Sequence, residues 1–303
     1  RNFIEHDLGG GVTRWTGTIE PLHTRAGVAI DTAWVADAAP WSYRVSAADY
    51  VARTKATFSN APLLQYANVE TGANVSLQPL ALNWTNDLSQ IQQISAVQSI
   101  TAELADDLMR WPGAYGTGRD FEYQNHPKRL IKRLVLQSAL PAPAAYILNG
   151  GNAVLQFQFI FSWTGATVWI DGAEWDKKTV KTTANRIEFR VAGVSVFWFD
   201  APTAYDANGE AAPGVVLKVR RAGNNLYVEV RTPYAWLQSA QYPVVIDPTL
   251  TDGYGGGATT YKDCSLMSGL PNYNTALNNQ VGVGKRNHPG NLYRSLLQFD
   301  VSS

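Results

Sequence analysis

The sequence is poor in cysteine and in charge, and it contains no long hydrophobic run. One cysteine, Cys264, among 303 residues excludes an intramolecular disulfide and a thiolate zinc cluster. Charged residues make up 17% of the chain and its formal net charge is zero, so it lacks the basic surplus of nucleic-acid-binding proteins. No apolar run approaches the roughly 18 residues that a membrane-spanning helix needs. We therefore expect neither a nucleic-acid partner nor membrane insertion.

Motifs for catalysis and metal binding are missing as well. The histidines have no metal-ligand spacing, there is no Gly-x-Ser-x-Gly elbow, and "GVGK" at residues 282–285 lacks the spacing of a phosphate loop. "DANGE" at residues 206–210 has the oxygen-rich composition of a calcium loop, but we interpret it as a turn around Asn208-Gly209. No catalytic residue, metal or cofactor is therefore expected.

Strand patterns dominate what is present. "AVLQFQFIFSW" at residues 153–163 alternates large apolar residues with Gln and Ser, which predicts one long strand. Asp171-Gly172, Ala192-Gly193 and residues 223–225 each separate two short apolar runs, which predicts three hairpins, the first with a type I′ turn. Such spacing indicates an all-β fold, with antiparallel β-sandwich modules in tandem and at most one or two short helices.

The first hundred residues are less regular. Short apolar runs there are broken by Gly, Pro and Asn, which predicts short strands. "TAELADDLMR" at residues 101–110 predicts a helix, because Thr101 could cap its start, acidic residues fill its early turns and Arg110 lies in its last turn. Pro112 and Gly113 would end that helix.

The stretch "YPVVIDPTLTDGYGGG", residues 242–257, predicts a boundary between modules. Pro243 is compatible only with an edge strand or a strand start, and Pro248 is expected to end the sheet; the glycines that follow suggest a flexible link. We divide the chain accordingly: an N-terminal β region at 1–100, a main sandwich module at 101–250, a Gly-rich linker at 251–260 and the start of another β domain at 261–303. A first residue other than Met and a strand-like end suggest a processed or partial polypeptide.

Ten tryptophans raise the question of a sugar-binding surface, because a flat aromatic ring presents an apolar face to pyranose C–H groups. Trp111, Trp169 and Trp175 are the candidate stacking residues, with Trp163 and Trp198 as further members. The alternative is that these rings belong to the core, as aromatic residues on strands usually do. A polysaccharide-cleaving enzyme is a third hypothesis, since two acids on one sheet face would suffice, although no pair stands out.

Several short motifs resemble a known family. "RTPYAWLQSAQYPVVIDPT" followed by glycines resembles the end of the β-rich module that precedes a DNRLRE domain in large bacterial surface proteins and phage structural proteins. The segment from residue 264 onward, with "PNYN" and "RSLLQFDVS", resembles the opening of that domain. Upstream, "EPLHTRAGVAIDTAWV" and "GTGRDFEYQNHPKRLIKRLVLQSALP" are similar to segments of the same proteins. The name-giving motif is expected beyond Ser303, so only a fragment of the domain is matched.

The resemblance implies a non-enzymatic structural or adhesive surface protein, with a phage virion fibre or a head or tail decoration protein as the first hypothesis. "LNWTNDLSQIQQIS" is similar to passages of virion proteins. The alternative is a secreted or cell-wall bacterial carbohydrate-binding module. Expected partners are other virion or surface proteins, further copies of the chain and host or cell-surface polysaccharide. The expected location is the virion surface or the cell exterior.

Overall fold

The computed structural model describes residues 29–45 and 47–253 with their side chains. Outside these ranges it describes backbone strands only: β1 (Phe3–Asp7), β2 (Thr13–Gly17), β27 (Tyr261–Met267), β28 (Gly284–Lys285) and β29 (Leu292–Phe299). The chain divides into two compact units, Arg1–Tyr254 and Gly255–Ser303. In the second unit the strand order is β27-β29-β28, and in the first unit β1 pairs with β2.

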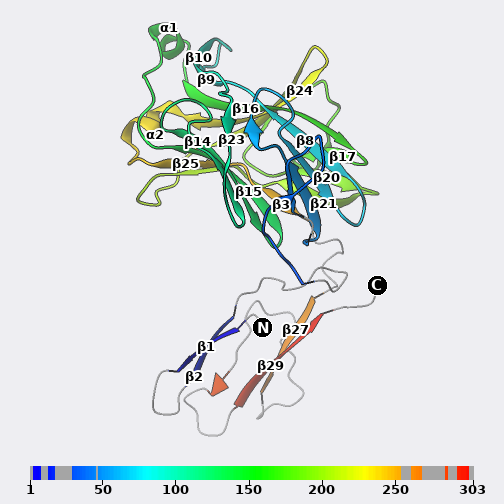
Figure 1. The fold of residues 1–303 in the computed structure, drawn as a ribbon. Coiled ribbons are helices and arrows are strands. Elements are labelled where there is room, and N and C mark those ends of the chain that lie inside the picture. Colours follow the sequence, from blue (N-terminus) through cyan, green and yellow to red (C-terminus); the bar gives the residue numbers. More distant parts are fainter. Residues whose placement is uncertain are drawn as a thin grey trace. The chain divides into compact units, whose positions relative to one another are not determined.

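The first unit contains two large antiparallel sheets (Figure 1). The order across the first large sheet is β19 (Lys181–Thr183), β23 (Val216–Ala222), β24 (Asn225–Pro233), β16 (Val154–Thr164), β8 (Asn74–Pro79), β7 (Leu64–Asn68), β5 (Tyr50–Thr54), β4 (Tyr43–Val45) and β3 (Val35–Ala36). In addition, β9 (Leu82–Thr85) pairs with β16 and with β10 (Ile91–Ser95). The long strand expected from the alternating pattern is thus β16, at the middle of this sheet.

The second large sheet is built from residues 103–252. Its order is β12 (Glu103–Ala105), β13 (Leu108–Trp111), β14 (Arg119–His126), β15 (Arg129–Leu136), β26 (Leu250–Asp252), β21 (Val194–Phe199), β20 (Ile187–Val191), β17 (Thr167–Ile170) and β18 (Ala173–Glu174). In addition, β25 (Val244–Asp247) pairs with β15 and with β22 (Thr203–Tyr205). A small sheet pairs β6 (Thr57–Phe58) with β11 (Ile100–Thr101).

The described residues form two short helices, α1 (Ala145–Asn149) and α2 (Tyr234–Ser239). Neither of them has the length and hydropathy that a membrane-spanning helix requires. The expectation of an all-β sandwich with at most two short helices is confirmed.

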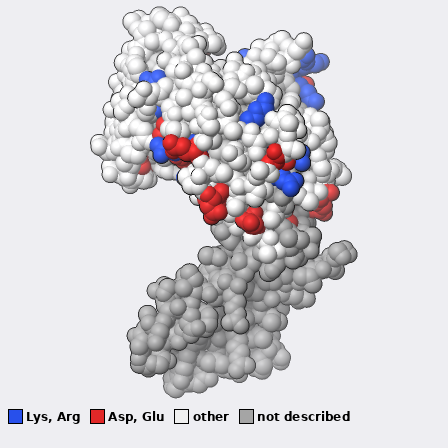
Figure 2. Space-filling view, in the orientation of Figure 1, with Lys and Arg blue, Asp and Glu red and all other residues white. Residues whose placement is uncertain are grey.

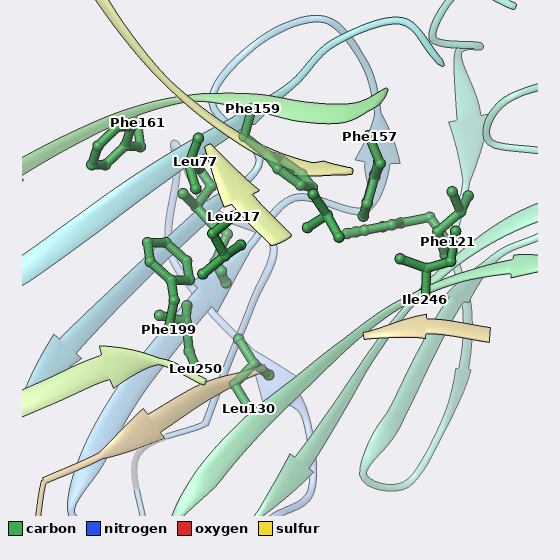
Figure 3. Close-up of a cluster of buried hydrophobic side chains, with 14 of the residues drawn as sticks. Leu77, Phe121, Leu130, Phe157, Phe159, Phe161, Phe199, Leu217, Ile246 and Leu250 are labelled. Atoms are coloured by element: carbon green, nitrogen blue, oxygen red, sulfur yellow. The ribbon is translucent and has the colours of Figure 1, made fainter. Parts of the chain in front are cut away.

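Aromatic side chains join the inner faces of the two large sheets. Phe157 and Phe161 of β16 belong to the first sheet. The ring centre of Phe121, in the second sheet, lies 6.0 Å from that of Phe157. The ring centre of Phe199, also in the second sheet, lies 6.5 Å from that of Phe161. Tyr66 of β7 contacts Phe197 of the second sheet at 5.5 Å. Figure 3 shows part of this core, with side chains from both sheets pointing toward one another.

The expected hairpins are present. Asp171 and Gly172 both have positive φ, 50° and 78°, between β17 and β18, as a type I′ turn requires. Ala192 and Gly193 form the same kind of turn between β20 and β21, with φ of 49° and 82°. Gly223 begins the turn between β23 and β24. Local turn chemistry therefore determined these three connections.

The helix expected at residues 101–110 is wrong. The segment instead forms β12, a turn at Asp106 with φ of 51°, and β13, in which Leu104 pairs with Met109. Met109 and Trp111 are completely buried, whereas Leu108 and Arg110 are only partly buried. This alternation suits a strand, and burial of two large side chains outweighs the weak helix preference of the local charges.

Residues 1–100 and 101–250, expected as separate regions, share a sheet, because β8 pairs with β16 over six residues. The sheet also does not end at Pro248. Two residues later Leu250 is completely buried, and β26 pairs with β15 and β21. The expected linker at 251–260 therefore begins inside the second large sheet; residues 254–260 lie outside the described residues.

One charged side chain lies within the aromatic core. Lys132 of β15 is 1% exposed, and its Nζ lies 4.2 Å from the ring centre of Phe159 and 5.0 Å from that of Phe199. Burial lowers the pKa of Lys132 to about 7, against the raising effect of Asp247. The rings stabilise the cation through their negative faces but replace only part of its lost hydration.

Stability of the protein should therefore rise between about pH 7 and pH 10. The folded pKa of Lys132 lies below its unfolded value, so the unfolded chain binds more protons in this window and rising pH favours folding. We expect Lys132→Met to lose this pH dependence and, at pH 7, to be as stable as the parent or up to a few kcal/mol more stable. Urea unfolding of both proteins at pH 7 and pH 9 tests this, and a stability difference independent of pH would contradict it.

Gly253 is a packed residue although it belongs to the glycine cluster. Its N–H donates to the carbonyl oxygen of Val196 at 2.7 Å. A Cβ at Gly253 would lie 2.5 Å from the Ser195 carbonyl oxygen and 2.8 Å from the Val196 carbonyl carbon. The first glycine of the cluster thus permits a close backbone approach between the end of β26 and β21.

Gly253→Ala should destabilise the first unit by about 1–3 kcal/mol, because backbone atoms must move to admit the methyl group. The matched control is Gly193→Asn, at a hairpin tip where an added Cβ meets nothing within 4 Å and where Asn tolerates the positive φ. Thermal unfolding followed by circular dichroism measures both variants. Equal melting temperatures for Gly253→Ala and the parent protein would contradict the packing.

Candidate functional site

A row of large polar and aromatic side chains crosses the outer face of the second large sheet. Trp169 of β17 pairs with Glu188 of β20, which in turn pairs with Trp198 of β21. All three are partly buried, whereas their neighbours Val168, Ile187 and Phe199 point into the core. Period-two alternation therefore places a carboxylate between two indole rings on the outward side.

Two arginines connect this row. The guanidinium carbon of Arg190 lies 4.4 Å from the ring centre of Trp169, and that of Arg186 lies 4.6 Å from the ring centre of Trp198. Both arginines bind Glu188, with N–O distances of 2.5 Å from Arg190 and 2.6 Å from Arg186. The result is a ladder of rings, guanidinium groups and one carboxylate that holds each side chain in place.

The pKa of Glu188 is lowered by this arrangement. Partial burial alone would raise it, but hydrogen bonds from Ser195, Arg190 and Arg186 have the larger combined effect. The Ser195 hydroxyl donates to Oε2 at 2.5 Å. Glu188 is therefore a stable anion at neutral pH, and it serves as an acceptor.

One end of the ladder opens into a surface concavity of about 580 Å³. This is the end at which β17 turns into β18, β20 begins and β21 finishes. The lining residues are Trp169, Asp171, Gly172, Asn185, Arg186, Glu188, Trp198, Asp200 and Ala201. We take this concavity as the candidate site, because an aromatic wall with a few fixed polar groups is typical of ligand-binding pockets.

The other carboxylates of the concavity are also held by neighbours. Asp171 accepts hydrogen bonds at Oδ1 from the Thr183 hydroxyl and the Asn185 amide, at 2.7 and 2.8 Å. These bonds, that of Asn185 first, lower the pKa of Asp171. Asp200 accepts from Trp198 Nε1 and from the Thr251 hydroxyl, both at 2.6 Å. The polar lining is thus preorganised.

The three candidate stacking residues do not come together. Trp169 borders the concavity, but Trp111 is completely buried and Trp175 is 3% exposed. Trp111 Nε1 donates to the Ala56 carbonyl oxygen and Trp175 Nε1 to that of Thr179, at 2.9 and 2.7 Å. Neither ring can meet a sugar face, which leaves Trp169, with Trp198 of the wider set, as the tryptophans that border the concavity.

Sequence reasoning missed Glu188, Arg186 and the fact that Trp198 and Trp169 both lie next to Glu188 on one sheet face. A signal for the first two existed: "RIEFR", residues 186–190, places Arg, Glu and Arg at alternate positions, which puts them on one face of a strand. The position of Trp198 could not be read in this way, because the β20–β21 register shifts between Phe189 and Arg190.

Two other kinds of site come into question, a metal site and the "DANGE" segment at residues 206–210. Within residues 29–45 and 47–253, no three His, Cys, Asp or Glu side chains are arranged to hold a metal ion. The segment "DANGE" forms the expected turn, in which Asp206 Oδ1 accepts from the N–H groups of Asn208 and Glu210. Gly209 has a φ of 78° there.

Comparison with protein-family models, curated protein sequences and solved structures found no match. The site must therefore be interpreted from the residues of this chain alone.

Glu188→Gln should destabilise the first unit by about 1–2 kcal/mol at pH 7, because both arginines lose their charged acceptor. The folded pKa of Glu188 lies below its unfolded value, so its stabilisation is present at neutral pH and is lost as the pH falls through that folded pKa. Urea unfolding at pH 7 and pH 3 should show a difference from the parent that shrinks at the lower pH. Glu174→Gln, an exposed acid on neighbouring β18, is the control, and a loss as large there would contradict a specific role for Glu188.

Proposed function

We propose that the chain is a non-enzymatic structural and adhesive surface protein, with a phage virion fibre or a head or tail decoration protein as the first candidate. The observation that carries the non-enzymatic part is the state of its carboxyl groups. Six described carboxyl groups have a lowered pKa and accept hydrogen bonds: Asp120, Asp171, Asp176, Glu188, Asp206 and Glu229. A general acid needs the opposite, a raised pKa that keeps its proton near neutral pH.

Glu229 illustrates how completely these groups are used for structure. Its side chain is fully buried on β24, and burial alone would raise its pKa. Hydrogen bonds from Gln156 and Arg220 and the charge of Arg231 reverse that effect. The Arg220 and Arg231 Nε atoms lie 2.5 and 3.0 Å from its two oxygens. Such a group is ionised at neutral pH, so it has no proton to donate and takes one up only reluctantly.

The virion assignment is supported by the sequence resemblance to DNRLRE-containing surface proteins and phage structural proteins. The surface agrees with a display role: Figure 2 shows one face on which charged side chains lie in small groups among uncharged ones. A surface with few charged groups has little nonspecific attraction to charged polymers. These arguments support the proposal by analogy and by composition.

The second candidate, a secreted or cell-wall carbohydrate-binding module, is favoured by the concavity beside Trp169. Among the described carboxyl groups, Asp247 has a raised pKa, which is what a general acid needs. Burial raises it, against the lowering effects of the Thr249 hydroxyl, Arg133 and Lys132. Asp247 is not among the residues lining the concavity, and its Oδ1 accepts from Thr249 at 2.5 Å.

Two measurements test the proposal. Antibodies against the purified chain should label the surface of phage particles from the source culture in immunogold electron microscopy. The purified chain should release no reducing ends and no unsaturated products from neutral or acidic polysaccharides.

Labelling confined to the bacterial wall would favour the second candidate. A turnover that Asp247→Asn abolishes while the fold stays intact would contradict the non-enzymatic function, because an enzyme typically loses a factor of about 10² to 10⁴ without its general acid or base. Asp120→Asn, at a carboxylate held by Arg110 and Gln137, is the matched control for effects on folding.

A further inference from the structure

We propose that the concavity beside Trp169 binds an uncharged, hydroxyl-rich saccharide, with the Trp169 ring as its stacking surface. This inference rests on the proposed adhesive function and specifies its ligand. It depends on three features of the site: the position of the rings, the polar groups around them and the sign of the local charge.

The strands that carry the two rings are separated by one strand. Trp169 and Trp198 lie on strands that flank β20, so their backbones are about 9–10 Å apart. This distance is comparable with the length of a disaccharide. Arg186, which stacks on Trp198, lines the concavity, whereas Arg190, which stacks on Trp169, does not. Arg190 therefore lies outside the concavity that Trp169 borders, and we assign the stacking surface to the part of the Trp169 ring that Arg190 leaves uncovered.

The polar groups suit hydroxyl groups. Asp171 Oδ1 accepts two hydrogen bonds from the protein, and Oδ2 accepts none from the described residues. Each Asp200 oxygen accepts one such bond and has a second lone pair. Asn185 is exposed and adds an amide. Sugar hydroxyl groups can donate to these carboxylates, which are already fixed in position.

The local charge selects against acidic ligands. Three carboxylates, Asp171, Glu188 and Asp200, line the concavity with a single guanidinium group, that of Arg186. Arg186 is itself bound to Glu188, with a 2.6 Å contact. Glu188 is balanced by Arg186 and Arg190, whereas Asp171 and Asp200 accept hydrogen bonds from uncharged groups. A uronic acid or sulfated sugar would meet these two carboxylates, and like charges are an effective means of rejecting a ligand. Neutral hexose polymers therefore fit best.

Affinity electrophoresis of the full chain tests the inference. One set of gels contains a soluble neutral polymer, namely mannan, galactan or β-glucan, and a second set contains an acidic polymer, namely alginate or polygalacturonate. At least one neutral polymer should retard the protein, and the acidic polymers should not. Trp169→Ala should weaken that binding at least tenfold, while Trp169→Phe, which keeps an aromatic face, should stay within a few-fold of the parent. Asp171→Asn should weaken binding several-fold, because it removes a charged acceptor and retains a residue that tolerates positive φ.

Tyr146→Ala is the matched control, since Tyr146 is an exposed aromatic residue on α1 outside the concavity. It should bind like the parent protein. Melting temperatures identify any variant that is not folded, and Asp171→Asn keeps the test valid if Trp169→Ala unfolds.

The inference would be overturned if only acidic polymers retained the protein or if no neutral polymer did. It would also be overturned if folded Trp169→Ala and folded Asp171→Asn bound as well as the parent protein. Particle labelling without saccharide binding would overturn it while leaving the proposed function intact. Saccharide turnover, in contrast, would contradict the proposed function itself.

Discussion

The Phe157, Phe159 and Phe161 rings of β16 lie between the two large sheets, and their burial fixes which face of each neighbouring strand turns outward. Aromatic contacts connect β16 to β14 and β21 of the opposite sheet. Because side chains alternate along a strand, a shift of one residue in any partner would place a large ring in water. Packing in the core therefore also determines which side chains lie on the outer face of each large sheet.

The outer residues of β17, β20 and β21 follow from that constraint. Phe189, Phe197 and Phe199 are buried, so Glu188 and Trp198 must point outward. A two-residue hairpin loop alone would pair Glu188 with Phe197; the bulge at Val196 changes this partner to Trp198. Gly253 packs against the same bulge through its N–H. The candidate site thus depends on one extra residue in one strand.

Sequence patterns predicted the strands and hairpins because those features are local. Asp171-Gly172 and Ala192-Gly193 specify their turns by backbone preference alone. The segment around Met109 was misassigned because its strand state depends on burial against residues distant in sequence. The same limit applies to the tryptophans. Composition cannot distinguish Trp111, at the core-facing end of β13, from Trp169, since both occur in strands that alternate with a period of two.

The carboxylates give the last step from structure to function. In the concavity, neighbouring hydrogen-bond donors lower the pKa of Asp171 and of Glu188, so these two groups can accept from a ligand's hydroxyl groups but are poor proton donors. Asp247 is the described exception, and its raised pKa arises from burial away from the concavity lining. The concavity thus combines fixed hydrogen-bond acceptors with an aromatic wall, and this combination is the basis of the proposed binding role. The ladder that holds the outer face of the sheet in place thereby also supplies Glu188 and Arg186 to the lining of the concavity.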